Sequence, residues 1–273
     1  MNAWAGIALA QRGPEDDAMH SRVPTYVHPL AGRSVAWHVL RAMGALNPAP
    51  RSLVLASPLL PEAESVADLD AELVPLNDES DWRDLVGGLP SDVERVVLVD
   101  GAAPALDHSL AVLVYGPVGR VLVDENGAPV ALSLERDDPA LAHAPDRLEA
   151  IARGRETIPG DPADTFLVRD RVGLARAARV LRDRIVRRHM EDGVTFLLPE
   201  SVLVDVDVRI GKDTVVYPGV VLEGKTTIGA ETVIGPGCRI IDSWVGSGVE
   251  LKGWNYVVGT NIRNRAVLEP YVR

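Results

Sequence analysis

The chain has 273 residues, of which 47% are hydrophobic and 25% charged, and its formal net charge at pH 7 is −11. This length allows one large or two modest domains, and the negative charge disfavours nonspecific binding to nucleic acid or to an anionic membrane. The single cysteine, Cys238, excludes a disulfide within one chain. No apolar run suits a membrane helix and no basic signal segment stands at the start, so we expect a cytoplasmic protein.

The first hundred residues alternate between short apolar runs and amphipathic stretches. Strands are predicted at Trp4–Ala10, Ser52–Ala56, Glu72–Val74 and Arg95–Asp100, and helical segments at Ser34–Leu46, Glu62–Ala67 and Trp82–Val86. Ser34 is the expected N-cap of the first helix. Strands that alternate with helices are typical of a parallel α/β sheet.

A β-hairpin is predicted after this region. Arg120–Val123 and Pro129–Leu134 flank Asp124–Gly127, which ends in Asn-Gly, the strongest short-range hairpin signal. The next stretch, Asp137–Asp164, is rich in Pro, Asp and Ala. We interpret it as a loop.

An arginine-rich helix is expected from Arg169 to Arg188. This segment holds eight arginines and two aspartates, a local charge of +6. Apolar residues recur at helical spacing at Leu174, Ala178, Leu181 and Ile185. No aromatic residues interleave with the arginines, which disfavours a nucleic-acid site. We interpret the helix as a solvated connector between two domains.

The C-terminal quarter carries a repeat of six residues. An aliphatic residue recurs at this interval at Val204, Ile210, Val216, Leu222, Ile228, Ile234 and Ile240. Such a period is typical of a parallel β-helix, in which about three hexads make one coil. Val204, Leu222 and Ile240, which are eighteen residues apart, are therefore expected to stack. One residue is missing after Ile240, and the column resumes at Val245.

Cys238 falls at a second inward position of this repeat. Small or β-branched residues stand four positions after several of the aliphatics, at Thr214, Val220, Thr226, Thr232 and Cys238. A buried thiol in apolar surroundings is inert. Cys238 is therefore predicted to be a small core residue rather than a nucleophile.

Taken together, several segments resemble the GlmU family of bacterial bifunctional enzymes, which join an N-acetylglucosamine-1-phosphate uridylyltransferase to a glucosamine-1-phosphate acetyltransferase. The matching segments are Val23–Arg33, Gly119–Val121 with the hairpin after it, Leu167–Leu181 and Gly193–Leu251. The resemblance implies a shortened Rossmann-like nucleotidyltransferase α/β domain at 1–168 and the connecting helix at 169–192. It also implies a left-handed parallel β-helix of hexapeptide repeats at 193–273, which forms a homotrimer.

The segment that matches the family's phosphate-binding loop departs from the family pattern. In the family this loop is rich in glycine, so that several backbone N–H groups converge on the nucleotide phosphates. Here Pro14 has no amide hydrogen, and Glu15–Asp17 supplies three consecutive carboxylates. Thr25 stands where the family has a lysine that neutralises phosphate charge. These departures predict weak or absent nucleotidyl transfer.

Asp100 and Asp170 are the candidate metal ligands. The resemblance places one family ligand after the strand that matches Arg95–Val99 and a second, an asparagine in the family, before the connecting helix. Two carboxylates could hold Mg²⁺, which prefers oxygen ligands. The alternative interpretation is structural, with a strand-end turn at Asp100-Gly101 and a helix N-cap at Asp170.

No counterpart of the family's acetyltransferase residues is found in this chain. In the family they lie beyond the point that Pro270–Arg273 resembles, and whether the reading frame extends past Arg273 bears on this activity. No histidine follows His189 to serve as a general base. The only lysines are Lys212, Lys225 and Lys252, which we interpret as solvated corners rather than a coenzyme A phosphate site. The sequence therefore indicates no catalytic and no cofactor-binding residue.

Three functions remain open from the sequence. The first is a GlmU-related protein of UDP-N-acetylglucosamine metabolism, the supply of a cell-wall precursor, that is catalytically weak or inactive and binds a sugar nucleotide or a related enzyme. The second is an active sugar-1-phosphate nucleotidyltransferase or acyltransferase. The third is a trimeric scaffold, with Trp244, Trp254 and Tyr256 on or near the surface between subunits.

Overall fold

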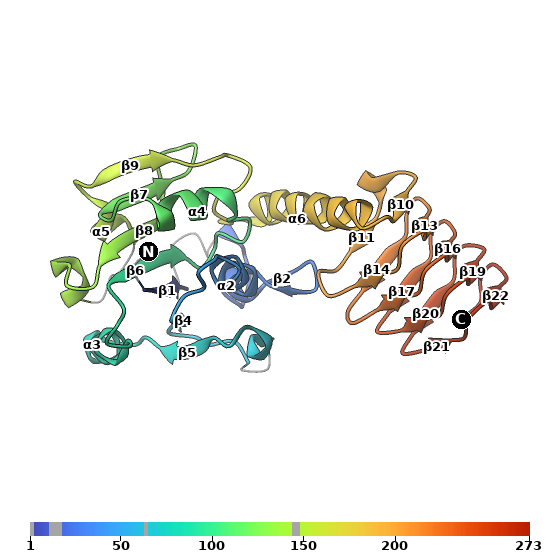
Figure 1. The fold of residues 1–273 in the computed structure, drawn as a ribbon, viewed down its shortest axis with the longest axis horizontal. Coiled ribbons are helices and arrows are strands. Elements are labelled where there is room, and N and C mark those ends of the chain that lie inside the picture. The colour runs from blue at the N-terminus through green and yellow to red at the C-terminus, as the bar shows by residue number, and fades with distance from the viewer. Residues whose placement is uncertain (1–2, 11–17, 63–64, 144–147) are drawn as a thin grey trace. The chain divides into compact units, whose positions relative to one another are not determined.

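The structure, a computed structural model, describes residues 3–10, 18–62, 65–143 and 148–273 (Figure 1). It divides into two compact units. Unit 1 consists of Met1–Leu30 and Ser34–Ala177, and unit 2 of Ala31–Arg33 and Ala178–Arg273. The division falls inside helix α6, which runs from Arg171 to Glu191, so this helix belongs in part to each unit.

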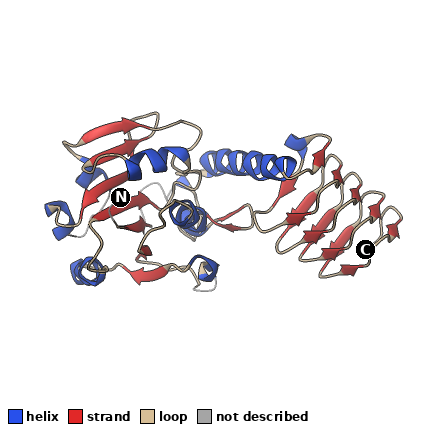
Figure 2. Ribbon diagram, in the orientation of Figure 1, coloured by secondary structure: helices blue, strands red, loops and turns tan. Residues whose placement is uncertain are grey.

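Unit 1 is built on a seven-stranded sheet in the order β5-β4-β1-β6-β8-β7-β9 (Figure 2). The strands are β1 (Trp4–Leu9), β4 (Ser52–Ser57), β5 (Glu72–Pro75), β6 (Arg95–Asp100), β7 (Arg120–Val123), β8 (Pro129–Glu135) and β9 (Glu156–Pro159). Strand β8 is antiparallel to β6 and β7, whereas the other pairings are parallel. The sheet is therefore mixed rather than all parallel, because the predicted hairpin places β8 between β6 and β7.

Short helices connect these strands. They are α2 (Val35–Gly44), α3 (Glu79–Gly88), α4 (His108–Tyr115) and α5 (Leu148–Ala152), with 3-10 turns η1 (Thr25–Val27), η3 (Ala67–Leu69) and η4 (Pro139–Ala142). The predicted cap of α2 is confirmed, since the Ser34 side chain accepts a hydrogen bond from the Trp37 N–H at 3.2 Å. A core that includes Trp82, Leu98 and Leu132 packs against the sheet.

One prediction for unit 1 is wrong, and another is tested only in part. The predicted helical segment Glu62–Ala67 lies partly outside the described residues, and a 3-10 turn, η3, is found at its end, at Ala67–Leu69. The expected loop Asp137–Asp164 contains α5 and β9, and β9 pairs with β7. Three of the four residues of β9 are exposed or nearly so, so its sequence lacks the apolar pattern by which buried strands are identified. Pairing with β7 overrides this weak local signal.

Unit 2 contains a left-handed parallel β-helix with three sheets, one on each side (Figure 1). The first sheet contains β10 (Thr195–Phe196), β13 (Val215–Val216), β16 (Val233–Ile234), β19 (Glu250–Leu251) and β22 (Val267–Leu268). The second contains β11 (Leu203–Val204), β14 (Val221–Glu223), β17 (Arg239–Ile241) and β20 (Tyr256–Val258). The third contains β12 (Arg209–Ile210), β15 (Thr227–Ile228), β18 (Trp244–Val245) and β21 (Asn261–Ile262). A 3-10 turn, η5 (Pro199–Ser201), lies between β10 and β11.

The predicted stacking of the repeat is confirmed. Val204 is in register with Leu222, and Leu222 with Ile240. All three side chains are buried, and so is Cys238. Burial raises the pKa of the Cys238 thiol, which agrees with an inert core residue.

The β-helix shortens at one corner in two successive coils. Ile228 pairs with Val245, and Val245 pairs with Ile262, so each of these coils has 17 residues instead of 18. The sequence predicted only the first of the two missing residues. Both are lost where the chain passes from the second sheet to the third, and the register of the ladders continues on either side.

Helix α6 has 21 residues, and its last two turns contain Arg187, Arg188, His189 and Glu191. None of the helices in the part of the chain that the structure describes combines the length and hydrophobicity that a bilayer span requires. The inward residues Leu181 and Ile185 are buried. The predicted amphipathic character of the helix is therefore confirmed at these positions.

Candidate functional site

The candidate site lies at the sheet edge where β1, β4 and β6 end. The Gly101 N–H donates to the Leu9 carbonyl at 2.8 Å, and the Ala10 N–H donates to the Ala56 carbonyl at 2.9 Å. These bonds hold the three strand ends together. In open α/β sheets, ligands bind in the crevice outside the carboxyl ends of the strands.

Asp100 ends β6 and turns the chain there. Its Oδ1 accepts a hydrogen bond from the Ala102 N–H at 2.8 Å. A Cβ at Gly101 would lie 2.9 Å from the Ala10 Cβ and 3.0 Å from the Leu9 carbonyl oxygen. Only glycine fits such a close approach without a shift, which gives Gly101 a structural reason.

Asp170 lies on a segment that neighbours the turn after Asp100. The Val168 N–H donates to the Ala102 carbonyl at 2.8 Å, so the chain before α6 runs beside the turn that follows Asp100. The Asp170 Oδ1 accepts from the Gly173 N–H at 2.6 Å, which is the bond of a helix N-cap. Both structural roles in the alternative interpretation are thus present.

The chemistry of these two carboxylates also suits Mg²⁺. A carboxylate that accepts one N–H keeps further lone pairs, and Mg²⁺ is commonly held by one or two carboxylates, with water and phosphate oxygens as its other ligands. Within the described ranges, no group of three or more His, Cys, Asp or Glu residues could hold a metal ion. The ligand role of Asp100 and Asp170 therefore stays a prediction.

Thr25, which the resemblance places where the GlmU family has a lysine, lies in η1. It is only 2% exposed. Next to it, the Tyr26 hydroxyl accepts a hydrogen bond from the Ser57 hydroxyl at 2.7 Å and donates to the Leu59 carbonyl at 3.1 Å. This network fixes η1 to the end of β4. A buried, uncharged threonine gives no positive charge to a phosphate group.

The predicted phosphate loop with Pro14 and Glu15–Asp17 lies outside the described residues. The chain on its far side is anchored, because Met19 is fully buried and its carbonyl accepts from the Arg171 Nε at 3.0 Å. Since Arg171 follows Asp170 directly, the residue after the loop and the start of α6 belong to one neighbourhood.

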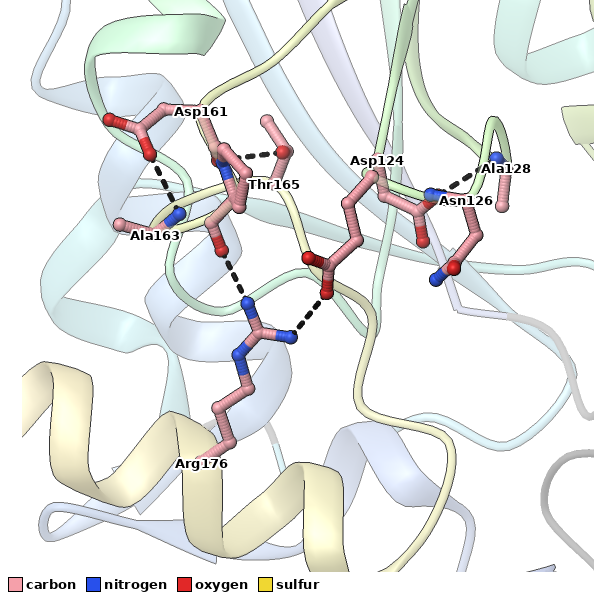
Figure 3. Close-up of polar contacts among 9 residues, drawn as sticks. Asp124, Asn126, Ala128, Asp161, Ala163, Thr165 and Arg176 are labelled. Carbon is pink, nitrogen blue, oxygen red and sulfur yellow. Dashed lines mark hydrogen bonds and ion pairs between the residues drawn. The ribbon is translucent and has the colours of Figure 1, made fainter.

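Arg176 organises a polar cluster that the sequence did not predict (Figure 3). Its guanidinium donates to Glu125 Oε1 at 2.8 Å and to the Pro162 carbonyl at 2.6 Å. It also lies over the Phe166 ring, 4.3 Å from the centroid. Arg176 thereby fixes the loops that follow β7 and β9 to the first turns of α6. Nothing in the sequence distinguishes this arginine from its seven neighbours.

Asp164 caps α4 from a distant part of the chain. Its Oδ2 accepts from the Ser109 N–H at 3.0 Å, and the Ser109 hydroxyl accepts from the Asp161 N–H at 3.0 Å. The residue preceding α4, Asp107, makes no capping bond with its side chain. The stretch Asp137–Asp164, which the sequence predicted to be a loop, therefore caps the start of α4, with a hydrogen bond between residues 55 positions apart.

Comparisons with known proteins agree with this architecture. Residues 207–242 match the family of bacterial transferase hexapeptide repeats (six repeats). The bifunctional protein GlmU of Geobacillus sp. (strain WCH70) is 48% identical over 89 residues, which is 33% of this chain and 19% of the relative. That of Caldanaerobacter subterraneus subsp. tengcongensis is 40% identical over 112 residues, 41% of this chain and 24% of the relative. The chain thus spans about a fifth to a quarter of the length of these curated relatives.

One solved structure shows the same fold over most of the chain. A nucleotidyl transferase from Methanothermobacter thermautotroptrophicus superposes with a TM-score of 0.51 and 14% sequence identity, covering 69% of this chain and 100% of that one. At this identity the likeness concerns the fold alone. The chain therefore has a nucleotidyltransferase-like α/β fold followed by a left-handed β-helix of hexapeptide repeats, and part of it is similar to GlmU.

Proposed function

We propose that this protein is a GlmU-related member of amino-sugar nucleotide metabolism that binds a sugar nucleotide and has little or no nucleotidyltransferase activity. The observation that carries the proposal is the burial of Thr25, which is 2% exposed at the position of the family's phosphate-neutralising lysine. A phosphate group at this edge therefore receives no charge compensation from that position.

The composition of the preceding loop also disfavours nucleotidyltransferase activity. Glu15–Asp17 supplies three consecutive carboxylates. At an effective dielectric constant near 20, a carboxylate about 4 Å from a phosphate charge costs roughly 4 kcal/mol before screening. Losing one charged contact that strengthens in the transition state typically lowers the rate by about two to three decades. Both changes together place turnover near the background rate.

The sugar-nucleotide part of the proposal rests on the intact edge of the sheet. Asp100 and Asp170 lie on adjacent segments there, and the donor set suits a Mg²⁺ ion, which would neutralise phosphate charge when bound. Tyr26 and Ser57 hold the neighbouring strand end in place. A ligand with fewer phosphate charges than a triphosphate meets less repulsion from the acidic loop.

The test compares turnover with binding in the full chain. With UTP, Mg²⁺ and N-acetylglucosamine 1-phosphate, we expect turnover near background. In thermal melts, UDP-N-acetylglucosamine should raise Tm, because a ligand that binds only the folded state stabilises it, whereas UTP should not. Turnover on the order of 1 s⁻¹ or faster would contradict the loss of activity. No rise in Tm with millimolar UDP-N-acetylglucosamine would contradict the binding.

A homotrimer through the β-helix is the second part of the proposal. Trp244, Trp254 and Tyr256 are 44%, 55% and 45% exposed, respectively, on the outside of the coils. Large aromatic residues at the surface are typical of protein interfaces. We expect the region Leu198–Val272 to mediate this assembly, which would also serve the scaffold function. Sedimentation of the protein as a monomer at micromolar concentration would exclude it.

A further inference from the structure

The corner of the β-helix between its third and first sheets is hollowed on the outside. The chain passes this corner after β15, after β18 and after β21, in three successive coils. A cavity of about 470 Å³ lies there, within unit 2. We refer to it as the corner notch, and it is lined by Ala230, Glu231, Ser247, Gly248, Asn264 and Arg265.

Gly248 leaves the gap in the middle of the corner notch. Glu231, Gly248 and Arg265 occupy the same position in successive coils, with left-handed backbones at φ +57°, +65° and +59°. The Gly248 N–H donates to the Ala230 carbonyl at 2.9 Å. The Arg265 N–H donates to the Ser247 carbonyl at 2.9 Å, so the three corners stack. Glu231 and Arg265 carry long side chains, whereas the residue between them has none.

Asn264 presents a fixed donor to the corner notch. Its Oδ1 accepts a hydrogen bond from the Ser247 N–H at 2.9 Å, which identifies the other end of the amide as the NH₂ group. A Cβ at Gly246 would lie 2.3 Å from the same Oδ1, so the amide lies directly on the Gly246 backbone. The Asn264 Nδ2 donates to no residue within the described ranges. Its N–H groups are therefore available to a ligand.

Glu231 and Arg265 are kept apart, unlike other opposite charges on the outside of the coils. Lys252, for example, forms an ion pair at 2.6 Å with Glu269 of the next coil. Glu231 and Arg265 are two coils apart, because Gly248 stands between them. Neither side chain forms a hydrogen bond or an ion pair with any residue that the structure describes. The corner notch therefore holds a carboxylate and a guanidinium on either side of one gap.

This gap suits a small molecule that carries both kinds of charge. A guanidinium pairs with a carboxylate or a phosphate group, and a carboxylate accepts hydrogen bonds from an amine. Two coil spacings place the Cα atoms of Glu231 and Arg265 about 10 Å apart. An ion-pair contact of about 3 Å at each end leaves roughly 4 Å between the amine and the anionic group of the ligand. Such a molecule has a short linker between its two charges.

Other classes of ligand fit the corner notch less well. A divalent cation prefers several oxygen ligands, and here it would meet one carboxylate and a guanidinium. A simple anion would be repelled by Glu231. An apolar molecule would remove water from the Ser247 hydroxyl and the Asn264 amide without replacing the hydrogen bonds.

We propose that the corner notch binds a small zwitterion, with its amine against Glu231 and its anionic group against Arg265 and the Asn264 amide. The anionic group is a carboxylate or a phosphate, since a guanidinium pairs with both. The ion pairs are exposed to solvent, so the affinity is weak, in the millimolar range, and falls as salt is added. The corner notch shares no residue with the candidate site of unit 1, so this ligand is independent of the nucleotide.

Saturation-transfer NMR on the full chain tests this proposal with two probes, β-alanine for the carboxylate and phosphoethanolamine for the phosphate. We expect at least one probe to bind more tightly than ethanolamine, propionate and inorganic phosphate, which each carry one kind of charge. The tighter probe identifies the anionic group. Glu231→Gln and Arg265→Gln should each raise Kd by about fivefold, the usual contribution of an exposed ion pair. Gly248→Asn should abolish binding, because asparagine accepts the left-handed backbone and fills the gap.

Arg263→Gln is the matched control. Arg263 is exposed and stands two residues before Arg265, but it does not line the corner notch, so Kd should stay at the wild-type value. Circular dichroism melts verify that each variant keeps its fold. The proposal is refuted if neither probe binds at about 10 mM, or if the singly charged molecules bind as tightly as the probes. It is equally refuted if Glu231→Gln leaves Kd within about twofold of wild type, or if Arg263→Gln raises Kd as much as Arg265→Gln does.

Discussion

The β-helix and the candidate site encode their structures in different ways. In the β-helix, the neighbours of a core residue are the equivalent residues of the coils before and after it, as Leu222 is between Val204 and Ile240. In the α/β unit, the site joins Leu9, Gly101 and Val168 through contacts that occur once. A repeated contact leaves a period in the sequence, whereas a single long-range contact leaves none.

This difference also governs how each region responds to change. Every coil presents an aliphatic residue to the same axis, so a wrong side chain affects the coils on both sides. At the sheet edge, the resemblance places Thr25 where the family has a lysine, yet the strand ends keep their hydrogen bonds. The fold of the α/β unit thus tolerates substitutions that change the charge of the candidate site.

The largest effect is expected from a substitution in the hydrophobic core of the β-helix. Ile228, in β15, is 2% exposed and stacks between coils. Ile228→Asp should destabilise the protein by more than about 4 kcal/mol or prevent folding, because it buries an unpaired charge. Circular dichroism melts measure the effect. Thr227→Asp, one residue away on the outer face, is the matched control and should change stability by at most about 0.5 kcal/mol. Equal tolerance of the two variants would show that the inward column is assigned wrongly.

A smaller effect is expected at the candidate site, where substitutions of Asp170 can distinguish its role as a helix N-cap from a role as a metal ligand. Asp170→Ala should lower stability by about 1 kcal/mol, the usual cost of losing an N-cap, whereas Asp170→Ser keeps a capping oxygen and should cost little. Both variants remove the carboxylate. If Asp170 binds metal, Mg²⁺ should raise the Tm of the wild type and of neither variant. A Tm of Asp170→Ser that rises with Mg²⁺ as in the wild type would leave Asp170 with the structural role alone.

The smallest effect concerns the start of the β-helix and depends on pH. His189 is 5% exposed, and its Nε2 has no hydrogen-bond partner among the residues that the structure describes. Burial lowers the pKa of His189 below its ordinary value of 6.5, and Arg188 lowers it further, while Asp192 opposes them. Below about pH 6.5 the unfolded chain therefore binds the proton more readily than the folded one, and stability falls as the pH falls.

His189→Phe should reduce this loss, since phenylalanine has a similar size and does not titrate. The measurement is Tm between pH 7.5 and pH 5 for both proteins, compared with His143→Phe. His143 has an exposed side chain, so its replacement should leave the slope unchanged. An identical slope in wild type and His189→Phe would mean that this histidine does not set the acid sensitivity of unit 2.

The contrast between repeated and single contacts also explains which features of the fold could be predicted from the sequence. The hexad predicted the stacked core, and a serine before an apolar stripe predicted the cap of α2. Strand β9 escaped notice because its partner β7 is distant and its own residues are largely exposed. Arg176 could not be selected from eight arginines, because its partners Glu125 and Pro162 reach it only through the fold.

The residues of the candidate site could be predicted from the sequence only in part. Asp100 and Asp170 could be named from the resemblance, and their structural roles from local turn and cap chemistry. Their closeness could not be predicted, because it depends on the bond from Val168 to Ala102 across 66 residues of sequence. The need for Gly101 depends in turn on the approach of Ala10 from another strand.

The two shortened coils have a consequence for protein engineering. Each loses its residue at the corner between the second and third sheets, near Asp242 and near Gly259, while the ladders on both sides stay in register. This corner therefore absorbs changes of length that the flat sides cannot. A foreign peptide displayed after Asp242 or Gly259 would project from a column of evenly spaced attachment points, leaving the hydrophobic interior of each coil untouched.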